Sequence, residues 1–580
     1  MFFPLWNENQ ASFLSEVRSG ALVPLNVNHT MLPNSPPLQT FLIESARGLY
    51  PIVYVRGFAP TAAAREETFY DAYYGYAETA VEKRTSSQEN GFQTPIVFEG
   101  QLIRFIKEYG YVDAVNGGLA LALSNETGRS QNPTQSLWIS RFYDTDVLSE
   151  KVRPIEEHAE ALRELICKTI PNQLKKLKDV QVDLGPGDQD YKVILIAHSM
   201  GGLVCRCLIQ NLFPEKGEDP KRWIHRFVTI GSPHGGIELS AVPDFLEELV
   251  IGKGNVLNAA IFREDRMRDY LKLTKKNTKG LRPHLQSLNG HFPEGRCLCL
   301  IGSDHDNYSG VKKITGGHSD GLVRQDRAYI KGAYWANVHR AHSGRRGIVN
   351  SFESYQNIRR FLFGDTKVRL WLENIDLQLD LPPDDIQEFY DIEFSLAVKG
   401  TGIFLHQRKQ NPCENAQRSN REEFPLAKVH LHTGFLDTKL RSRGDAFSHF
   451  LLAFRIAQHR VREGFFFDEQ YPERTIYSES LEVRINLAPP DSKDLPAVAF
   501  RWLSDTTQPD NEQSWTPASL GENGIFRFAL RQANTLKPGG SICLKPVRWP
   551  DETTEQVNFD AAEDKALGSD AFEKPAKSKN

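Results

Sequence analysis

Ser199 is the residue of this sequence best placed to act as a nucleophile. It stands in the pentapeptide AHSMG, after the apolar run Lys192–Ala197 and before a segment with helical spacing, Leu203–Leu212. A serine hydroxyl becomes a nucleophile when it is exposed, oriented and deprotonated by a neighbouring base. A sharp strand-to-helix turn exposes it, provided that the residues two positions before and after are small, as Ala197 and Gly201 are. For the pentapeptide alone, the alternative is a serine that caps a helix.

Attack on a carbonyl carbon also needs hydrogen-bond donors aimed at the developing oxyanion. Met200 follows the nucleophile at the start of the expected helix, so its backbone N–H is one candidate donor. The second donor should come from a loop after an early strand, and the run Pro51–Val55 is followed by such a loop, RGF. Gly57 permits a tight turn there, and the N–H of Phe58 is the second candidate. An ordinary glycine turn is the alternative.

Strands and helices alternate along residues 51–365. Runs typical of strands are Pro51–Val55, Ser136–Tyr143, Lys192–Ala197, Arg226–Ile230, Arg296–Ile301 and, at the sheet edge, Tyr334–Val338. Helical spacing is found at Phe98–Tyr109, Pro154–Leu177, Leu203–Leu212 and Tyr355–Phe363. This alternation predicts an α/β domain with a mostly parallel, helix-covered sheet and right-handed crossovers. Residues 1–50 are expected to form a loop-rich N-terminal extension.

A long insertion at residues 240–290 separates two of the expected strands. Its part Ala241–Leu273 is amphipathic, with one helical face formed by Phe245, Leu246, Leu249 and Val250. Long insertions in compact domains are often functional lids. We therefore predict a helical lid, with a fixed cap as the alternative.

The apolar pattern changes to strict alternation near residue 366. Alternating runs separated by polar turns occur at Tyr390–Val398, Leu481–Leu487 and Ile525–Leu530. This pattern predicts an all-β sandwich over residues 366–548. Residues 549–580 are charged and poor in aromatic side chains, which predicts a disordered tail.

Five motifs in a fixed order carry a resemblance to a known superfamily. They are IVYVRGF, VILIAHSMGGL, VTIGSPHGG, SDGLV and a late histidine. Together they resemble the serine lipases and esterases of the α/β-hydrolase superfamily, over about residues 50–364. The nearest types are the bacterial true lipases and the lipases that resemble GPI inositol-deacylases and lecithin acyltransferases. AHSMGG is similar to small Bacillus lipases, and SDGLV to Pseudomonas and Burkholderia lipases. One departure is Arg56, where those lipases usually have histidine.

The resemblance implies which residues complete the site. The aspartate of the SDGLV turn, Asp320, would hold and orient the base. Asp304 and Asp306, which follow an earlier strand, are the rival acids, with Asp304 as the alternative that is weighed. The base should follow the acid in chain order. His342, in a loop just before the last helix of the domain, has the expected position, and His339 is the alternative. His198 and His234 are expected to be structural, and His318 to be a loop residue.

The resemblance also implies a reaction. An α/β-hydrolase domain with this triad would cleave carboxylic esters of lipid-like substrates through an acyl-enzyme, as a lipase, phospholipase or esterase. An acyltransferase with the same triad is one alternative. A non-catalytic binding or scaffolding protein, with the β-sandwich as its active part, is the other. A lid and an appended sandwich would suit an enzyme that contacts a lipid interface peripherally.

Composition limits the remaining classes. The 70 basic and 74 acidic residues give a net charge of −4, which gives no reason to expect a nucleic-acid partner. No apolar run approaches the ~20 residues of a membrane-spanning helix. The N-terminus does not resemble a signal peptide, so we expect a cytoplasmic protein, with signal-independent export as the alternative. The seven cysteines are expected to be reduced and buried.

No cofactor is expected. The one segment that resembles a metal site contains Asp304, Asp306 and Asn307, an oxygen-rich set like part of a calcium loop. A structural Ca²⁺ there is the alternative to a solvated polar loop, which is the prediction.

Overall fold

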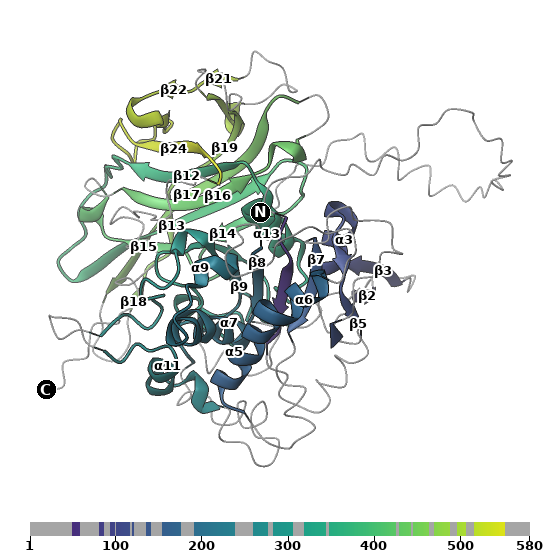
Figure 1. Cartoon of the computed structure of the whole chain (residues 1–580). Coiled ribbons are helices and arrows are strands. Elements are labelled where there is room, and N and C mark those ends of the chain that lie inside the picture. The colour runs from purple at the N-terminus through teal and green to yellow at the C-terminus, as the bar shows by residue number, and fades with distance from the viewer. Residues whose placement is uncertain are drawn as a thin grey trace, which may run out of the picture. The chain divides into compact units, whose positions relative to one another are not determined.

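The structure is a computed structural model of the chain (Figure 1). It describes residues 49–57, 80–85, 93–98, 100–116, 119–120, 135–140, 153–175, 191–237, 259–275, 282–305, 318–343, 347–424, 428–441, 445–462, 469–487, 496–505 and 515–550. The expected N-terminal extension and C-terminal tail lie outside these residues, except for residues 49–50 and 549–550. The described residues all belong to one compact unit of the chain.

Seven parallel strands form the sheet of the first domain, in the order β11-β10-β9-β8-β1-β7-β4. Their bounds are β1 Ile52–Val55, β4 Val112–Asp113, β7 Ser136–Ser140, β8 Val193–His198, β9 Ile224–Ile230, β10 Cys297–Gly302 and β11 Tyr334–Val338. Parallel strands with both faces covered are nearly continuous apolar runs, which is why most of these segments were recognisable in the sequence. The short strand β4 was not among the predicted strands. The predicted α/β sheet is confirmed.

Helices cover both faces of the sheet. They are α3 Gln101–Tyr109, α5 Ile155–Glu164, the π-helical η2 Leu165–Thr169, α6 Ile170–Lys175, α7 Met200–Cys207, the π-helical η3 Leu208–Leu212, α8 Phe213–Glu215, α9 Pro220–Trp223 and α13 Phe352–Phe363. Buried side chains of α5 and α7 share a core with alternate residues of β1 and β8, such as Val53 and Leu195. On the other face α13 contacts β9, β10 and β11, and its Tyr355 ring lies 5.2 Å from that of Phe105 on α3.

The strand order reverses around β1. From β1 the chain reaches β7 on one side and then returns, through α5 and α6, to β8 on the other side. In open α/β sheets, such a switch leaves a crevice at the carboxyl ends of the strands, where ligands bind. Because Val55 and Ala197 are register partners, the loop with Gly57 and the turn with Ser199 leave the sheet side by side.

Short elements complete the first domain. They are the strands β2 Ala80–Thr85, β3 Gln93–Phe98, β5 Val115–Asn116 and β6 Leu119–Ala120, the helix α11 Glu264–Tyr270, and the 3-10 turns η5 Ala259–Phe262, η6 Glu294–Arg296 and η7 Gln325–Arg327. Only part of the predicted lid is described. Met267 and Tyr270 of α11 are buried in the domain core. Residues 238–258 and 276–281 lie outside the description, so the lid stays a prediction.

The second domain contains two antiparallel sheets that share one core, coloured green to yellow in Figure 1. The first has the order β16-β12-β24-β23-β22, with β12 Thr366–Glu373, β16 Val429–Leu436, β22 Ser519–Leu520, β23 Phe526–Ala529 and β24 Ser541–Arg548. The second has the order β14-β13-β17-β19-β20-β21, with β15 and β18 paired alongside. Its bounds are β13 Ile386–Val398, β14 Phe404–Arg408, β15 Gln417–Ser419, β17 Ser448–Arg462, β18 Glu469–Gln470, β19 Arg474–Asn486, β20 Ala497–Trp502 and β21 Thr516–Pro517.

The two sheets enclose apolar side chains from both, such as Leu370 of β12 and Phe394 of β13. A β domain that follows the α/β domain is therefore confirmed. The 3-10 turns described between its strands are η8 Arg421–Glu423, η9 Thr438–Leu440, η10 Leu503–Asp505 and η12 Glu522–Gly524.

The second domain contacts the first at the edge strand β11 and at α13. The backbone N–H of Asn337 on β11 donates to His406 Nδ1 at 3.1 Å. The Asn357 amide of α13 donates to the carbonyl oxygen of Leu405 at 2.8 Å. His406 lies in a buried histidine cluster, His406, His430 and His432, around Trp335 of β11. No described helix is both long and apolar enough to cross a bilayer.

Candidate active site

Ser199 sits in a strained turn between β8 and α7. Its backbone angles are φ 52° and ψ −126°, a conformation that non-glycine residues rarely adopt. Such strain is concentrated at functional sites, where the surrounding structure must enforce it. The Ser199 side chain is half-buried, and the helix α7 begins directly after it. The hydroxyl therefore stays accessible to a substrate, as nucleophilic attack requires.

Glycines on both sides let the turn approach β1. A Cβ atom on Gly201 would lie 2.4 Å from the Val55 carbonyl oxygen, and one on Gly57 would lie 2.9 Å from Ser199 Cβ. A Cβ on Gly202 would lie 2.3 Å from Ser232 Oγ. These distances are shorter than any non-bonded contact permits, so the size restriction expected at Gly201 has a direct cause in the neighbouring strand.

Ser199, His342 and Asp320 form one hydrogen-bonded chain. His342 Nε2 lies 3.0 Å from Ser199 Oγ, and His342 Nδ1 lies 2.8 Å from Asp320 Oδ2. Because a carboxylate only accepts, the Nδ1 proton is directed to Asp320, and the lone pair of Nε2 is left for the serine proton. The three residues that the motif order assigned to one site are thus brought together from the turn after β8, the 318–325 loop and the loop after β11.

Backbone groups hold the acid and the base in place. Asp320 is 1% exposed, and its Oδ1 accepts from the N–H groups of Leu322 at 3.0 Å and Val323 at 2.7 Å. The N–H of His342 donates to the Asp320 carbonyl oxygen at 2.8 Å. Gly231, at φ +55°, lies against the pair: a Cβ there would be 3.1 Å from Asp320 Oδ2 and 3.2 Å from His342 Nδ1.

A family model described as palmitoyl protein thioesterase matches residues 132–275, which include β7, β8 and the turn at Ser199. The domain has the α/β-hydrolase fold. The family match covers only residues 132–275 of the chain, and it indicates a hydrolase.

The solved structure of Bacillus licheniformis lipase BlEst2 in its propeptide form is similar at 12% identity and a TM-score of 0.29. The likeness covers 76% of this chain and 95% of that one. None of the curated protein sequences matches the chain.

The rival residues of the hydrolase site have other neighbours. His339 Nδ1 lies 3.2 Å from Ser303 Oγ, and the Asp304 N–H donates to the Arg340 carbonyl oxygen at 3.2 Å. Both ring nitrogens of His342 are occupied, by Ser199 and Asp320. The hydrogen-bonded chain therefore has no place for Asp304 as the acid or for His339 as the base.

The oxyanion donors are described only in part. Met200 is the first residue of α7, where backbone N–H groups have no partner within the helix. Phe58, the second predicted donor, lies outside the described residues, which end at Gly57 on this loop.

His198 and His234 have defined neighbours in the hydrolase domain. His198 Nε2 lies 3.1 Å from the His342 carbonyl oxygen, with ring centroids 4.9 Å apart. Burial lowers the pKa of His198 well below its usual range, so its neutral ring donates Nε2–H to that carbonyl. His234 Nε2 lies 3.1 Å from Thr229 Oγ1, and burial lowers its pKa as well.

A buried arginine in the helix after Ser199 was not identified from the sequence. Arg206 of α7 is 0% exposed and donates to three carbonyl oxygens: those of His234 at 3.0 Å, Leu285 at 2.8 Å and Ser287 at 2.9 Å. Burial lowers its pKa to about 10, so it stays charged at neutral pH. It ties the helix after Ser199 to two loops of the hydrolase domain. Only the i,i+4 spacing to Gln210, which accepts from Nε at 2.9 Å, could have drawn attention to it.

Neither metal nor disulfide chemistry stands out in the described part of the chain. No group of three histidine, cysteine, aspartate or glutamate side chains there could hold a metal ion. Of the expected calcium segment, Asp304 is described, and Asp306 and Asn307 are not. The cysteines are free thiols, and burial raises the pKa of those in the hydrolase core, such as Cys299 to about 11.

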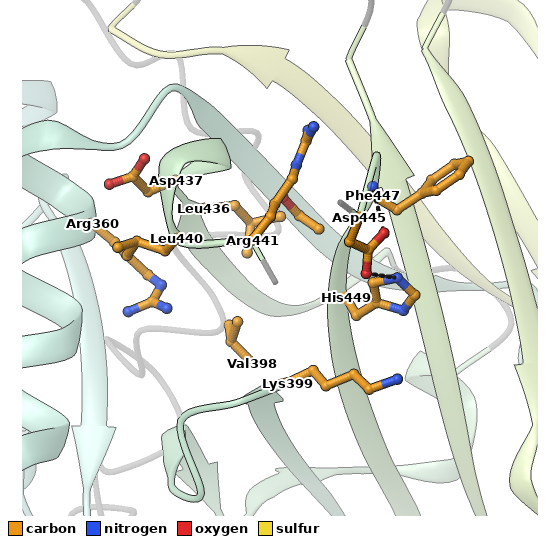
Figure 2. A pocket seen from close by; sticks show the side chains of 11 residues that line it. Arg360, Val398, Lys399, Leu436, Asp437, Leu440, Arg441, Asp445, Phe447 and His449 are labelled. Atoms are coloured by element: carbon orange, nitrogen blue, oxygen red, sulfur yellow. Dashed lines mark hydrogen bonds and ion pairs between the residues drawn. The ribbon is translucent and has the colours of Figure 1, made fainter. Parts of the chain in front are cut away.

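A pocket next to α13 is separate from this site. Figure 2 shows 11 lining residues, among them Arg360, Lys399 and the His449–Asp445 pair, whose Nε2 and Oδ2 atoms lie 3.1 Å apart. None of the 11 belongs to the hydrogen-bonded chain at Ser199. The pocket is therefore no part of the candidate active site.

Proposed function

We propose that this protein is a serine hydrolase that cleaves carboxylic esters of lipid-like substrates through an acyl-enzyme. The observation that carries the proposal is the hydrogen-bonded chain from Ser199 Oγ through His342 to Asp320. Nucleophile, base and orienting carboxylate in hydrogen-bond contact are the arrangement that serine catalysis requires. The family match supports an ester-type substrate.

The proposed reaction has two halves. His342 Nε2 takes the Ser199 proton as Oγ attacks the carbonyl carbon, and then gives it to the leaving alcohol. Water, deprotonated by the same nitrogen, attacks the acyl-enzyme and releases the acid. Asp320 holds the imidazole orientation and stabilises the imidazolium. The N–H groups of Met200 and Phe58 are the proposed oxyanion donors.

The test is the Ser199→Ala variant of the full chain. Turnover of p-nitrophenyl esters should fall on the order of 10⁵- to 10⁶-fold, because the other members of a triad contribute little without the nucleophile. Thermal unfolding should be unchanged, since the hydroxyl has no structural role. Ser504→Ala, on the sandwich, is the matched control and should keep full activity. Retained turnover in Ser199→Ala would sink the proposal.

A fluorophosphonate probe separates the enzyme from a scaffold. A triad of this kind should react with the probe at Ser199, and the adduct can be located by peptide mass spectrometry. The absence of labelling in the intact protein would favour a non-catalytic binding protein on a hydrolase fold.

A thioester is the second candidate substrate, favoured by the family match over residues 132–275. Palmitoyl-CoA and p-nitrophenyl palmitate present the same acyl group on a thiol and on an alcohol. The ratio of kcat/KM for the two identifies the preferred leaving group. The same assays with added acceptor alcohols distinguish hydrolysis from acyl transfer.

A further inference from the structure

The proposed catalytic acid lies in a tight hairpin, which we call the acid loop, residues 318–325. The N–H of Gln325 donates to the His318 carbonyl oxygen at 2.9 Å, and Ser319 and Arg324 form an antiparallel bridge. At the tip, the N–H of Asp320 donates to the Val323 carbonyl oxygen at 3.2 Å. The position of the Asp320 carboxylate therefore depends on where the two ends of this hairpin are held.

A loop of the β-sandwich reaches this hairpin. It connects β14 to β15, residues 409–416, and we call it the sandwich loop. The Asn415 side chain shapes it, because its Oδ1 accepts from the Lys409 N–H at 2.8 Å and its Nδ2 donates to the Gln407 carbonyl oxygen at 3.1 Å. The Gln410 N–H donates to Glu393 of β13 at 3.0 Å, so the loop is fixed to the sandwich.

Consecutive residues of the sandwich loop bond to both ends of the acid loop. The Gln325 side-chain amide donates to the Cys413 carbonyl oxygen at 3.1 Å, in a fully buried contact. His318 Nδ1 donates to the Glu414 carbonyl oxygen. The Glu414 carboxylate also lies 4.0 Å from Nε2 of His305, which is in the loop that follows β10. Cys413 is 1% exposed and Gln325 7%, so water does not compete for the bond between them.

We propose that the β-sandwich positions the catalytic acid: the carbonyl groups of Cys413 and Glu414 hold the two ends of the acid loop, and so keep Asp320 in register with His342. The inference rests on the proposed function of Ser199, His342 and Asp320. Glu414 has φ +48°, which a residue other than glycine or asparagine rarely adopts, and this turn directs both carbonyls at the hairpin. In this view the sandwich supports the active site and is more than an appended module.

A small displacement of the acid loop should lower kcat. The bond from His342 Nδ1 to Asp320 Oδ2 is 2.8 Å long, and a misplacement of about 1 Å within a catalytic arrangement can cost about 100-fold in rate. Substrate binding does not involve Asp320, so kcat should fall while KM changes little.

The test uses two variants that act from opposite sides of the contact. Gln325→Met keeps the size of the side chain and removes the donor to Cys413. Asn415→Ala loosens the sandwich loop without altering any residue of the α/β-hydrolase domain. Each should lower kcat about 10- to 100-fold with KM within about 2-fold of the unmodified protein. The double variant should be no slower than the slower single one, because both remove the same support.

Gln458→Met is the matched control. It replaces another buried glutamine of the sandwich, whose amide donates to Glu388 at 2.6 Å on a different part of the sheet. It should lower the unfolding temperature but leave kcat unchanged. The downfield proton signal of the His342 Nδ1–H in NMR spectra is a second readout. It should shift or broaden in Gln325→Met and Asn415→Ala and stay in place in Gln458→Met.

The outcomes are separable. Unmodified kcat and an unmoved proton signal in both Gln325→Met and Asn415→Ala, with Ser199→Ala inactive, would overturn the positioning role and leave the hydrolase proposal intact. An equal loss of kcat in Gln458→Met would also overturn it, because the effect would then be general destabilisation. An unmodified protein that neither turns over esters nor labels at Ser199 would overturn both proposals.

Discussion

Asp320 shows how much of the chemistry depends on single atoms. Its Oδ1 accepts two backbone N–H groups, and its Oδ2 faces His342 Nδ1. The carboxylate is thereby fixed in rotation, and it admits one tautomer of the imidazole. In that tautomer Nε2 carries the lone pair that must take the serine proton.

Asp320→Asn should therefore be nearly isosteric and nearly inactive. The amide keeps an oxygen for Leu322 and Val323 and turns its NH₂ toward His342, so the imidazole adopts the wrong tautomer. We expect kcat for p-nitrophenyl esters to fall about 10⁴-fold. Asp304→Asn, the rival acid, is the control and should keep its activity. If Asp304→Asn is the inactive variant, the assignment of the acid is wrong.

The order of motifs predicted which three residues meet, and the geometry places them in contact. The expected position before the last helix favoured His342 over His339, but both follow β11 within one short loop, and spacing does not give the physical difference between them. That difference depends on the backbone direction there: the N–H of His342 bonds to Asp320, while the His339 ring faces Ser303. The carbonyl groups that accept hydrogen bonds from Arg206 also cannot be predicted from the sequence, because every residue has a backbone carbonyl.

At the scale of elements, the turn between β8 and α7 depends on its contact with β1. The Cβ that alanine would add at position 201 lies 2.4 Å from the Val55 carbonyl oxygen and 2.7 Å from that of Arg56. Both obstacles are backbone atoms, one in the last residue of the central strand β1 and one in the residue after it, and they cannot move aside.

Gly201→Ala should thus displace Ser199 and abolish fluorophosphonate labelling, with an unfolding free energy lower by about 2–4 kcal/mol from overpacking and strain. Gly217→Ala is the matched control, because nothing lies within 4 Å of the added Cβ although φ is +69°. It should cost about 1 kcal/mol and leave labelling unchanged. Labelling of Gly201→Ala at the unmodified rate would contradict this account of the turn.

Most elements of the α/β domain were predictable because buried parallel strands are continuous apolar runs. The strands β1, β8, β9 and β10 begin or end within a few residues of the expected positions. The sandwich loop was not predictable as a partner of the acid loop. Its contacts join two backbone carbonyls to one glutamine and one histidine, which leave no periodic pattern in the chain.

At the scale of the whole molecule, the two domains meet around the buried histidine cluster, His406, His430 and His432. The rings of His406 and His432 stack with centroids 4.1 Å apart, and the Arg408 guanidinium lies over the Trp335 ring. Burial, with neighbouring positive charge, lowers the pKa of all three, that of His432 to about 3. The folded protein thus holds these rings neutral.

Stability should fall as the solution becomes acidic. In the unfolded chain each of these histidines binds a proton below its ordinary pKa of about 6.5, whereas in the folded protein it does not, so unfolding takes up protons. Each contributes about 1.4 kcal/mol of lost stability per pH unit below that value. For His432 the loss continues until its folded pKa of about 3.

His432→Phe keeps an aromatic ring and removes one titrating group. Unfolding by urea at pH 7, 6, 5 and 4 should show a shallower loss of stability in this variant, by about 1.4 kcal/mol per pH unit. Equal slopes for the two proteins would show that His432 is already protonated in the folded state.

The bond from Asn337 to His406 affects how the sheet edge at β11 can pair with other molecules. β11 is the last strand of its sheet, and a bare edge of this kind pairs readily with strands of other molecules. Here the second domain occupies that edge, and a buried ring accepts the outward N–H. Because the sandwich covers this edge, we expect the hydrolase domain alone to self-associate more readily than the full chain.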